Sequence, residues 1–228
     1  MHANSRPVTS NQSGLHDQLH LVVQRHANSH YLKPVAPTSR QSFDTARSAW
    51  QQAGSLPLII DAGCGVGLST RRLAQQFPEH FVIGVDQSDD RLSREVRWPG
   101  ALPENFIQVR ADLVDFWRLM LEARLHPARH YLLYPNPWPK KSQLARRWHG
   151  HPIFPVLMAL GGEIECRSNW KIYIEEFAAA AAQLSGLPVF CEAYLPEAVA
   201  LTPFEEKYRA SGHPLWRCRL SLEPQPGR

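Results

Sequence analysis

Hydrophobic and polar positions alternate along most of this chain in blocks that are typical of strands and helices following one another. Short apolar runs predict strands near residues 57–61, 81–85, 106–109, 130–134, 187–194 and 215–221, and residues 157–166 are a candidate for one more. Apolar residues that recur every three or four positions predict helices near residues 40–51, 68–77, 88–96, 112–124 and 170–184. This alternation predicts an α/β fold with a Rossmann-like, doubly wound and mostly parallel sheet, whose ligands bind at the carboxyl ends of the strands.

The polar beginning of the chain and its total length indicate the domain organisation. Residues 1–30 lack a periodic apolar face, so we expect a mobile polar tail before a single domain over residues 31–228. A chain of 228 residues with 43% hydrophobic residues is long enough for one domain with a sizeable core. Residues 195–214 are expected to form a long loop at the ligand-binding edge of the sheet.

Composition and spacing indicate where the protein is located and which kinds of site the sequence does not suggest. No apolar run approaches the roughly 20 residues needed to span a bilayer, and the N-terminus is polar rather than signal-like. The four cysteines stand far apart without a C-x-x-C pair, and the histidine pairs at four-residue spacing lack the H-E-x-x-H form. We therefore expect a soluble cytoplasmic protein with no metal site and no membrane contact, in which the histidines have surface or capping roles. A monomer and a homodimer both fit the sequence.

A glycine-rich turn follows the first predicted strand, with Asp61 at the end of the strand and then Gly63, Gly65 and Gly67. The helical pattern begins directly afterwards, which is typical of a ligand-binding turn at a helix N-terminus. The spacing is G-x-G-x-G, whereas a dinucleotide fingerprint requires its third glycine where Leu68 stands. An acid just before the glycines suits a cationic, amine-bearing ligand better than a pyrophosphate. S-adenosylmethionine carries both a sulfonium and an amine, so the turn predicts a site for that cofactor.

Two further acids follow the next two predicted strands. Asp86 lies about 20 residues beyond the glycines, where an acid typically bonds ribose hydroxyls. Asp112 follows the strand near residues 106–109 and is a candidate for contact with the adenine edge. Because the carboxyl ends of parallel strands share one edge of a sheet, the glycine turn and both acids are expected to lie together.

The stretch after the strand near residues 130–134 is the most distinctive, because three prolines bracket Asn136 and Trp138 and two lysines follow, Lys140 and Lys141. A residue before proline is pushed out of the helical region, so we expect Asn136 and Trp138 to be extended. The asparagine amide offers one acceptor and two donors, and the indole offers a stacking face. These features predict a pocket for a nucleobase, and the alternative is a rigid proline-rich loop without a ligand.

Charge is unevenly distributed although the formal net charge is only +4. No acidic residue stands between Glu122 and Glu163, a stretch that contains Arg124, Arg129, Lys140, Lys141, Arg146 and Arg147. Cations beside a nucleobase pocket are what neutralisation of RNA phosphates requires. A solvated basic face is the alternative interpretation.

These motifs resemble those of the bacterial tRNA (guanine-N7)-methyltransferases, in which a Pro-Asp-Pro-Trp-Pro-Lys segment precedes basic residues. Residues 135–140 with the following arginines are similar to that segment, residues 168–170 to the family's Thr-Asp segment, and residues 202–208 to its C-terminal Thr-x-aromatic-Glu signature. The similarity extends over roughly residues 56–221. It implies a class I S-adenosylmethionine-dependent methyltransferase fold and methylation of N7 of a guanine in the variable loop of tRNA.

The resemblance also assigns roles to individual residues. It implies a cofactor site at the glycine turn, Asp61, Asp86 and Asp112, and a catalytic position at Asn136. Together with the basic run it indicates substrate contacts at Trp138, Lys140, Lys141, Arg146, Arg147, Asn169, Thr202, Phe204 and Glu205.

The chain departs from this family at three places. It has Asn136 and Asn169 where the family has aspartate, and it lacks the histidine that the family has between Lys141 and Arg146. These departures leave two alternatives open. Asn136-Pro137-Trp138 is partly similar to the Asn-Pro-Pro-aromatic pattern of amino-group methyltransferases, so the enzyme could act on a different base or an amine. A cofactor-binding RNA protein with little turnover is the other alternative.

Overall fold

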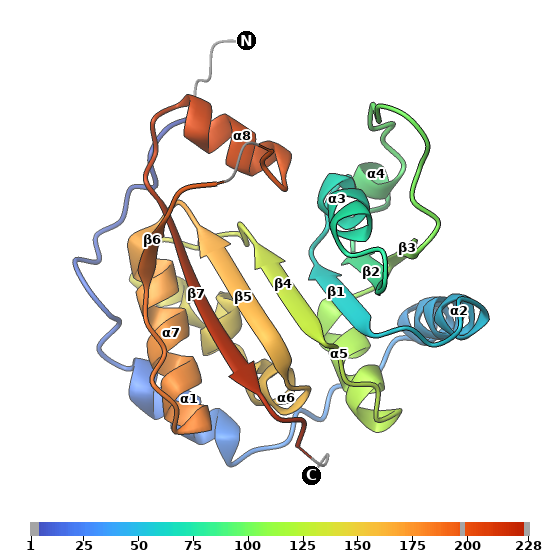
Figure 1. Cartoon of the computed structure of the whole chain (residues 1–228). Coiled ribbons are helices and arrows are strands. Elements are labelled where there is room, and N and C mark those ends of the chain that lie inside the picture. The colour runs from blue at the N-terminus through green and yellow to red at the C-terminus, as the bar shows by residue number, and fades with distance from the viewer. Residues whose placement is uncertain (1–4, 197–198, 226–228) are drawn as a thin grey trace.

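One seven-stranded sheet in the order β3-β2-β1-β4-β5-β7-β6 organises the protein in the computed structural model, which describes residues 5–196 and 199–225 (Figure 1). Strands β1 to β5 are parallel, and β7 runs antiparallel to both β5 and β6. The strands are β1 (Leu58–Ala62), β2 (Phe81–Asp86), β3 (Phe106–Arg110), β4 (Arg129–Leu133), β5 (Gly162–Ser168), β6 (Glu192–Tyr194) and β7 (Leu215–Leu222).

Helices cover both faces of the parallel part of the sheet. The α-helices are α1 (Leu19–Ala27), α2 (Pro37–Gln52), α3 (Leu68–Gln76), α4 (Asp89–Leu92), α5 (Leu113–Glu122), α6 (Phe154–Ala159), α7 (Lys171–Ser185) and α8 (Pro203–Ala210), with 3-10 helices η1 (Lys141–Arg146) and η2 (Trp148–Gly150). The predicted doubly wound, mostly parallel α/β sheet is confirmed. No helix among residues 5–196 and 199–225 is long and apolar enough to cross a membrane.

Strand β1 shows why the sheet is covered on both faces. All five of its residues are buried, as the uninterrupted apolar run in the sequence indicates. Because side chains alternate along a strand, Leu58 and Ile60 contact the larger core cluster with α2 and α5. Ile59 points to the opposite face and contacts the smaller cluster with Leu73 and Ala74 of α3.

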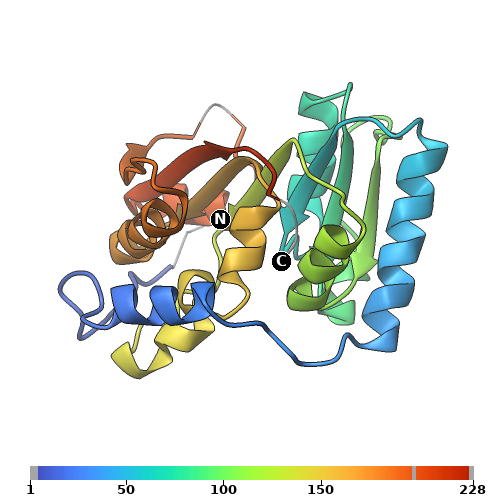
Figure 2. The same ribbon diagram turned by 90° about the horizontal axis from the view of Figure 1, so that it is seen from below.

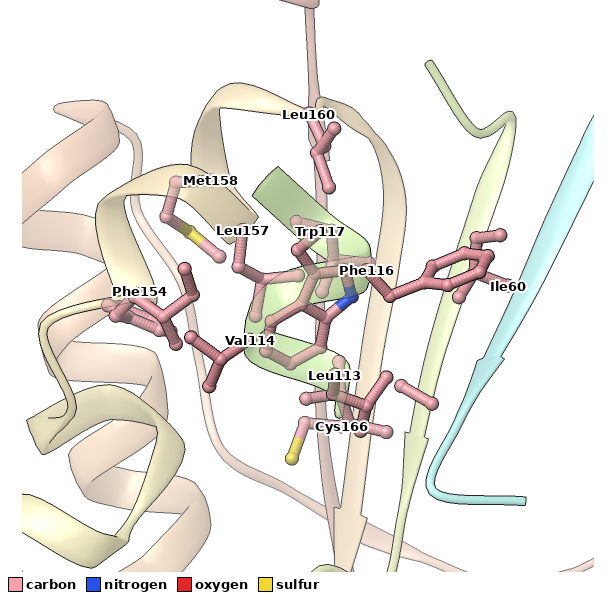
Figure 3. Packing of buried hydrophobic residues seen from close by; sticks show 14 of the residues in the cluster. Ile60, Leu113, Val114, Phe116, Trp117, Phe154, Leu157, Met158, Leu160 and Cys166 are labelled. Carbon is pink, nitrogen blue, oxygen red and sulfur yellow. The ribbon is translucent and has the colours of Figure 1, made fainter. Parts of the chain in front are cut away.

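The larger core contains a polar pair that the sequence does not reveal. Trp117 is buried among apolar residues of α5, α6 and β5, including Leu157 and Cys166 (Figure 3). Its indole nitrogen donates a hydrogen bond of 3.0 Å to Nε2 of His130, which is also fully buried. Burial lowers the pKa of His130 to about 3, so the ring is neutral. The prediction of a surface or capping role is wrong for this histidine.

The prediction of a mobile polar tail over residues 1–30 is also wrong within the described residues; residues 1–4 lie outside them. Helix α1 packs against α7 and η2, as Figure 2 shows from below. Leu19, Val23 and His26 form its buried face at spacings of four and three residues. The apolar stripe was missed because one of its members is a histidine.

Four other elements differ from the prediction. Residues 157–166 contain the end of α6 and the start of β5 rather than one strand, and residues 187–194 form a strand only over Glu192–Tyr194. The helix expected at residues 88–96 is the four-residue α4, and the long loop expected at 195–214 contains α8. The start of α8 carries ordinary helix signals, because Thr202 accepts a hydrogen bond from the Glu205 amide and Pro203 is the first helical residue.

Candidate active site

The chain makes a tight turn at the carboxyl end of β1. This turn contains three glycines because its backbone is left-handed at three positions. The φ angles of Gly63, Gly65 and Gly67 are 79°, 60° and 77°, a region that other residues adopt only at a cost. The amides of Gly63 and Cys64 donate to the Val85 carbonyl at 2.8 and 3.1 Å. These bonds fix the turn against the end of β2.

Asp61 supports the turn from beneath. Its Oδ2 accepts hydrogen bonds from the hydroxyls of Ser69 and Thr70 in the first turn of α3, at 2.6 and 2.7 Å. Burial raises the pKa of Asp61 to about 6, although these two hydrogen bonds oppose the shift. A side chain added at Gly84 would come within 2.3 Å of the Thr70 hydroxyl, so Gly84 lets α3 lie this close to β2. Asp61 is therefore buried, and it holds the first turn of α3 against the end of β1.

Asp86 lies at the end of β2 and is also buried. Its Oδ2 accepts from the Gly65 amide at 2.9 Å, and its Oδ1 accepts from the Ser88 amide at 2.8 Å and pairs with the Arg91 guanidinium at 3.0 Å. A carboxylate has about four acceptor positions, so one position on Oδ2 is left for a ligand hydroxyl. Asp86 therefore shapes the turn and retains capacity for one more donor.

Strand β3 contributes Gln108, a candidate site residue that no sequence motif marks. Its amide nitrogen is buried without a hydrogen-bond partner among the described residues and lies where a side chain at Gly67 would be. Such an unsatisfied donor is costly unless a ligand or water pairs with it. Asp112, after β3, caps α5 by accepting from the Val114 amide at 2.9 Å. The sequence could not predict that the Gln108 amide is buried and unpaired, because this depends on how the strands pack in the sheet.

The proline-rich loop leaves β4 in a strained conformation. Tyr134 and Trp138, each followed by proline, have φ angles of 55° and 45°, so the prediction that Trp138 is extended is wrong. Such angles in aromatic residues cost about 1–3 kcal/mol each and persist only where the surroundings enforce them. Asn136 is exposed between them, and its amide has no hydrogen-bond partner among the described residues.

The sheet brings the two sequence motifs together although about 70 residues separate them. Strand β1 pairs directly with β4, with Asp61 opposite Tyr131, and β4 is where the strand order reverses. Helices α3 and α8 stand on either side of the carboxyl ends of these two strands (Figure 1). The glycine turn and the Asn136 loop therefore lie at the topological switch point, where open α/β sheets bind ligands.

Arg147 corrects a prediction about substrate contacts. It is completely buried and forms an ion pair of 2.5 Å with Glu176, which is also completely buried. Its guanidinium lies 4.9 Å from the ring centre of Trp170. The adjacent Arg146 is exposed, with its guanidinium 4.7 Å from the ring centre of Trp138. Arg147 thus has no surface to offer a phosphate, whereas Arg146 has.

The acid-free stretch does not form one basic face. Lys140, Lys141 and Arg146 are exposed on the segment after β4, at the switch-point end of the sheet. Arg129 begins β4 and pairs with Glu163 at 2.6 Å, so it lies at the other end of the strand. Arg124 precedes β4 at that same end. Only the second half of the stretch accompanies the candidate site.

The C-terminal motif forms a support behind the loop. Glu205 is fully buried and accepts from the Tyr134 hydroxyl at 3.0 Å and from Arg167 at 3.1 Å. Thr202 is buried as the N-cap of α8. Phe204 is half exposed and stacks near Tyr208, while the Asn169 amide lies 3.2 Å from a ring nitrogen of His213. Glu205 therefore connects α8 to β5 and to the residue that follows β4, Thr202 caps α8, and Phe204 remains accessible.

Comparison with known proteins identifies this arrangement. A profile of the family described as "Putative methyltransferase" matches residues 55–218, which include the glycine turn, the Asn136 loop and α8. The chain belongs to this methyltransferase family. The family suggested by the sequence motifs and the prediction of an enzyme are thereby confirmed.

Relatives of this methyltransferase are similar over most of the chain. The tRNA (guanine-N(7)-)-methyltransferase of Acidovorax sp. (strain JS42) is 26% identical over 168 residues, 71% of this chain and 66% of that protein. The protein of the same name from Bordetella pertussis (strain Tohama I) is 27% identical over 227 residues, 94% of this chain and 87% of that protein. Among solved structures, the 16S rRNA methyltransferase KamB matches with a TM-score of 0.53 at 17% identity, covering 84% of this chain and 97% of that one, which shows a shared fold.

Proposed function

We propose that this methyltransferase transfers a methyl group from S-adenosylmethionine to N7 of a guanine in the variable loop of tRNA, in the cytoplasm. The observation that carries the proposal is the placement of the glycine turn beside the Asn136 loop at the switch point of the sheet. A cofactor held by the turn and a base held by the loop would meet at this edge. The relatives named tRNA (guanine-N(7)-)-methyltransferase support the choice of base and of RNA.

The turn has the features that the cofactor requires. A side chain built at Gly65 meets no atom within 4 Å, so there is open room beside its backbone. Asp86 offers one free acceptor position for a ribose hydroxyl, and the orphaned Gln108 amide offers a donor. Asp112 uses one carboxylate oxygen to cap α5, which leaves the other for the adenine edge. When bound, S-adenosylmethionine supplies an activated methyl group on a sulfonium.

The loop residues would orient the base. The N7 lone pair of guanine lies in the ring plane and is free, so methylation needs no general base, only an in-line approach. Holding two reactants near their attack geometry supplies roughly 7–11 kcal/mol. The exposed Asn136 amide would accept a hydrogen bond from the guanine edge through its oxygen. Arg146 and Trp138 would contact the neighbouring nucleotide with a charge and an aromatic face.

The cofactor assignment predicts that Asp86→Ala weakens binding of S-adenosylmethionine and of its demethylated product. Loss of a charge-assisted hydrogen bond costs about 1.5–3 kcal/mol, or roughly a 10- to 150-fold rise in Kd. Titration calorimetry with both ligands measures this change. Asp90→Ala is the matched control, because Asp90 is an exposed acid of α4 whose carboxylate pairs with Arg94 of the same segment. Undetectable binding to the wild type, or equal affinity in Asp86→Ala, would refute the assignment.

The RNA assignment predicts that affinity for tRNA falls steeply with salt and that Arg146→Ala makes the slope shallower. Removing one cation from a phosphate reduces the slope of log affinity against log salt by about one unit. Fluorescence anisotropy at several salt concentrations measures the slope. Arg40→Ala serves as the control, because Arg40 is a half-exposed cation of α2, away from the loop. If Arg146→Ala leaves the slope unaltered, Arg146 belongs to a solvated basic face and does not bind a tRNA phosphate.

A further inference from the structure

Three consecutive carbonyl oxygens of the Asn136 loop are held by hydrogen bonds from outside it. Arg147 donates through Nε to the Trp138 carbonyl at 3.1 Å and through its terminal nitrogen to the Lys140 carbonyl at 3.3 Å. The carbonyl between them, of Pro139, accepts from the Ser10 hydroxyl at 2.6 Å. A loop with left-handed Trp138 needs such enforcement to persist.

Glu176 at the centre of α7 is the hub of this arrangement. Its Oε2 accepts from Arg147 at 2.5 Å and from His149 at 2.8 Å. Its Oε1 accepts from the amide of His16 at 2.8 Å and from the side chain of Gln12. The four acceptor positions of the carboxylate are thus filled, and two of the four donors come from the N-terminal segment.

Gln12 connects the two halves of the hub. It is buried, its amide nitrogen donates to Glu176, and its amide oxygen accepts from Arg147 at 3.1 Å. Asp17, further along the same segment, lies 3.3 Å from the Lys141 ammonium at the far end of the loop. Residues 10–17 therefore contact the loop directly through Ser10 and Asp17 and indirectly through Gln12.

We propose that residues 10–17, acting through Arg147 and Glu176, hold the Asn136 loop in the conformation that receives the base, which makes Arg147 a positioning residue for methyl transfer. The expected effect on turnover rests on the proposed function. The holding of the loop does not, because it is a property of the protein alone. Within the described residues the glycine turn shares no hydrogen bond with this hub, so cofactor affinity should not depend on the hub.

The first measurement needs no substrate. Trypsin cleaves native protein after exposed Lys140 and Lys141 only when the loop opens, so the cleavage rate reports how firmly it is held. Gln12→Leu should speed cleavage there about tenfold or more, and Ser10→Ala should act in the same direction to a smaller extent, because each removes hydrogen bonds to the hub or loop. Mass spectrometry of the fragments assigns each cut.

Gln183→Leu is the matched control. Gln183 of α7 also binds the N-terminal segment, donating to the His20 carbonyl at 3.0 Å, but among the described residues it makes no hydrogen bond to the loop. Unchanged cleavage in both Gln12→Leu and Ser10→Ala, or equal acceleration in Gln183→Leu, would overturn the proposal. Ser10 lies at an exposed contact, so its variant keeps the test valid if Gln12→Leu fails to fold.

The second measurement tests the consequence for the reaction. In Gln12→Leu, kcat on tRNA should fall at least tenfold while the Kd for S-adenosylmethionine and the KM for tRNA change less than twofold. Faster cleavage with unchanged kcat would overturn the positioning role. A wild-type protein that methylates no tRNA, with the cleavage result as expected, would refute the proposed function and leave the holding of the loop established.

Discussion

Glu176→Gln is expected to lower the free energy of unfolding by about 3–5 kcal/mol, because it leaves the buried Arg147 guanidinium without its counter-charge. The glutamine amide would also bring two hydrogens to a place where Glu176 accepts from four donors. A loss of this size is a large share of the roughly 5–15 kcal/mol that stabilises a typical domain. Urea unfolding followed by circular dichroism measures it.

The same residue predicts the response to acid. Burial by itself would raise the pKa of Glu176, but the hydrogen bond from His149 and the charge of Arg147 outweigh burial and lower the pKa to about 2, from 4.5. The stabilisation is therefore present above pH 4.5 and is lost as the pH falls towards 2. It amounts to roughly 3 kcal/mol. The wild type should lose this increment between pH 4.5 and 2, and Glu176→Gln should lack it.

Glu175→Gln provides the control for both measurements. Glu175 is the preceding residue of the same helix and pairs with the half-exposed Lys171 at 3.1 Å. An exposed pair contributes about 0–1 kcal/mol, so this variant should unfold nearly like the wild type and keep its acid dependence. If both variants lose the same stability, the buried ion pair does not have the role assigned to it.

Asn136→Ala is expected to reduce kcat on tRNA about 10²- to 10³-fold, because it removes the exposed amide that the proposed function assigns to binding the guanine edge. Binding of the cofactor should be unchanged. Single-turnover assays on unmodified tRNA transcripts measure the effect. Ser142→Ala is the control, because Ser142 is an exposed polar residue just after the same loop. A rate that Asn136→Ala leaves within a few-fold of the wild type would remove Asn136 from the reaction.

Asn136→Asp separates the proposed reaction from methylation of another base. With guanine, a carboxylate would stabilise the positive charge that develops on the ring, so kcat should rise roughly tenfold, or about 1.4 kcal/mol. With a substrate that needs the asparagine donor, the same change should abolish activity, because that donor is lost and an uncompensated charge is added.

The parts of the site that follow from local sequence were predictable. The glycine turn and the acids at the ends of β1, β2 and β3 lie where the strand periodicity indicates, because glycine spacing and strand ends are local properties. The proline-rich loop was located for the same reason. Its backbone was not, because the carbonyls of Trp138 and Pro139 accept hydrogen bonds from Arg147 and from Ser10, and Ser10 is distant in the sequence.

Arg146 and Arg147 show the limit of sequence interpretation most directly. Adjacent in one basic run, they look equivalent, yet one is exposed over Trp138 and the other is buried against Glu176. Glu176 stands 29 residues away in a helix whose other inward positions are apolar. A buried charge is recognised by its partner, and the partner appears only when α7 and the loop are packed together.

The polar N-terminal segment illustrates the same point. A segment containing Gln12, His16 and Asp17 has the composition of a tail. The Gln12 side chain and the His16 backbone amide nevertheless donate to the buried Glu176 carboxylate, and Asp17 pairs with Lys141. Composition therefore favoured a mobile tail. The helix signals of α8, by contrast, were present at Thr202 and Pro203.

The most direct test of the proposed function is to incubate the protein with labelled S-adenosylmethionine and unmodified tRNA transcripts and to identify the methylated base by mass spectrometry. The proposed function predicts 7-methylguanine at one position in the variable loop and its disappearance with Asn136→Ala. Methylation of a different base or of an amine would contradict the assigned substrate. No methylation of any tRNA, by wild type or Asn136→Asp, while both still bind cofactor and RNA, would contradict the assignment of this protein as a tRNA methyltransferase.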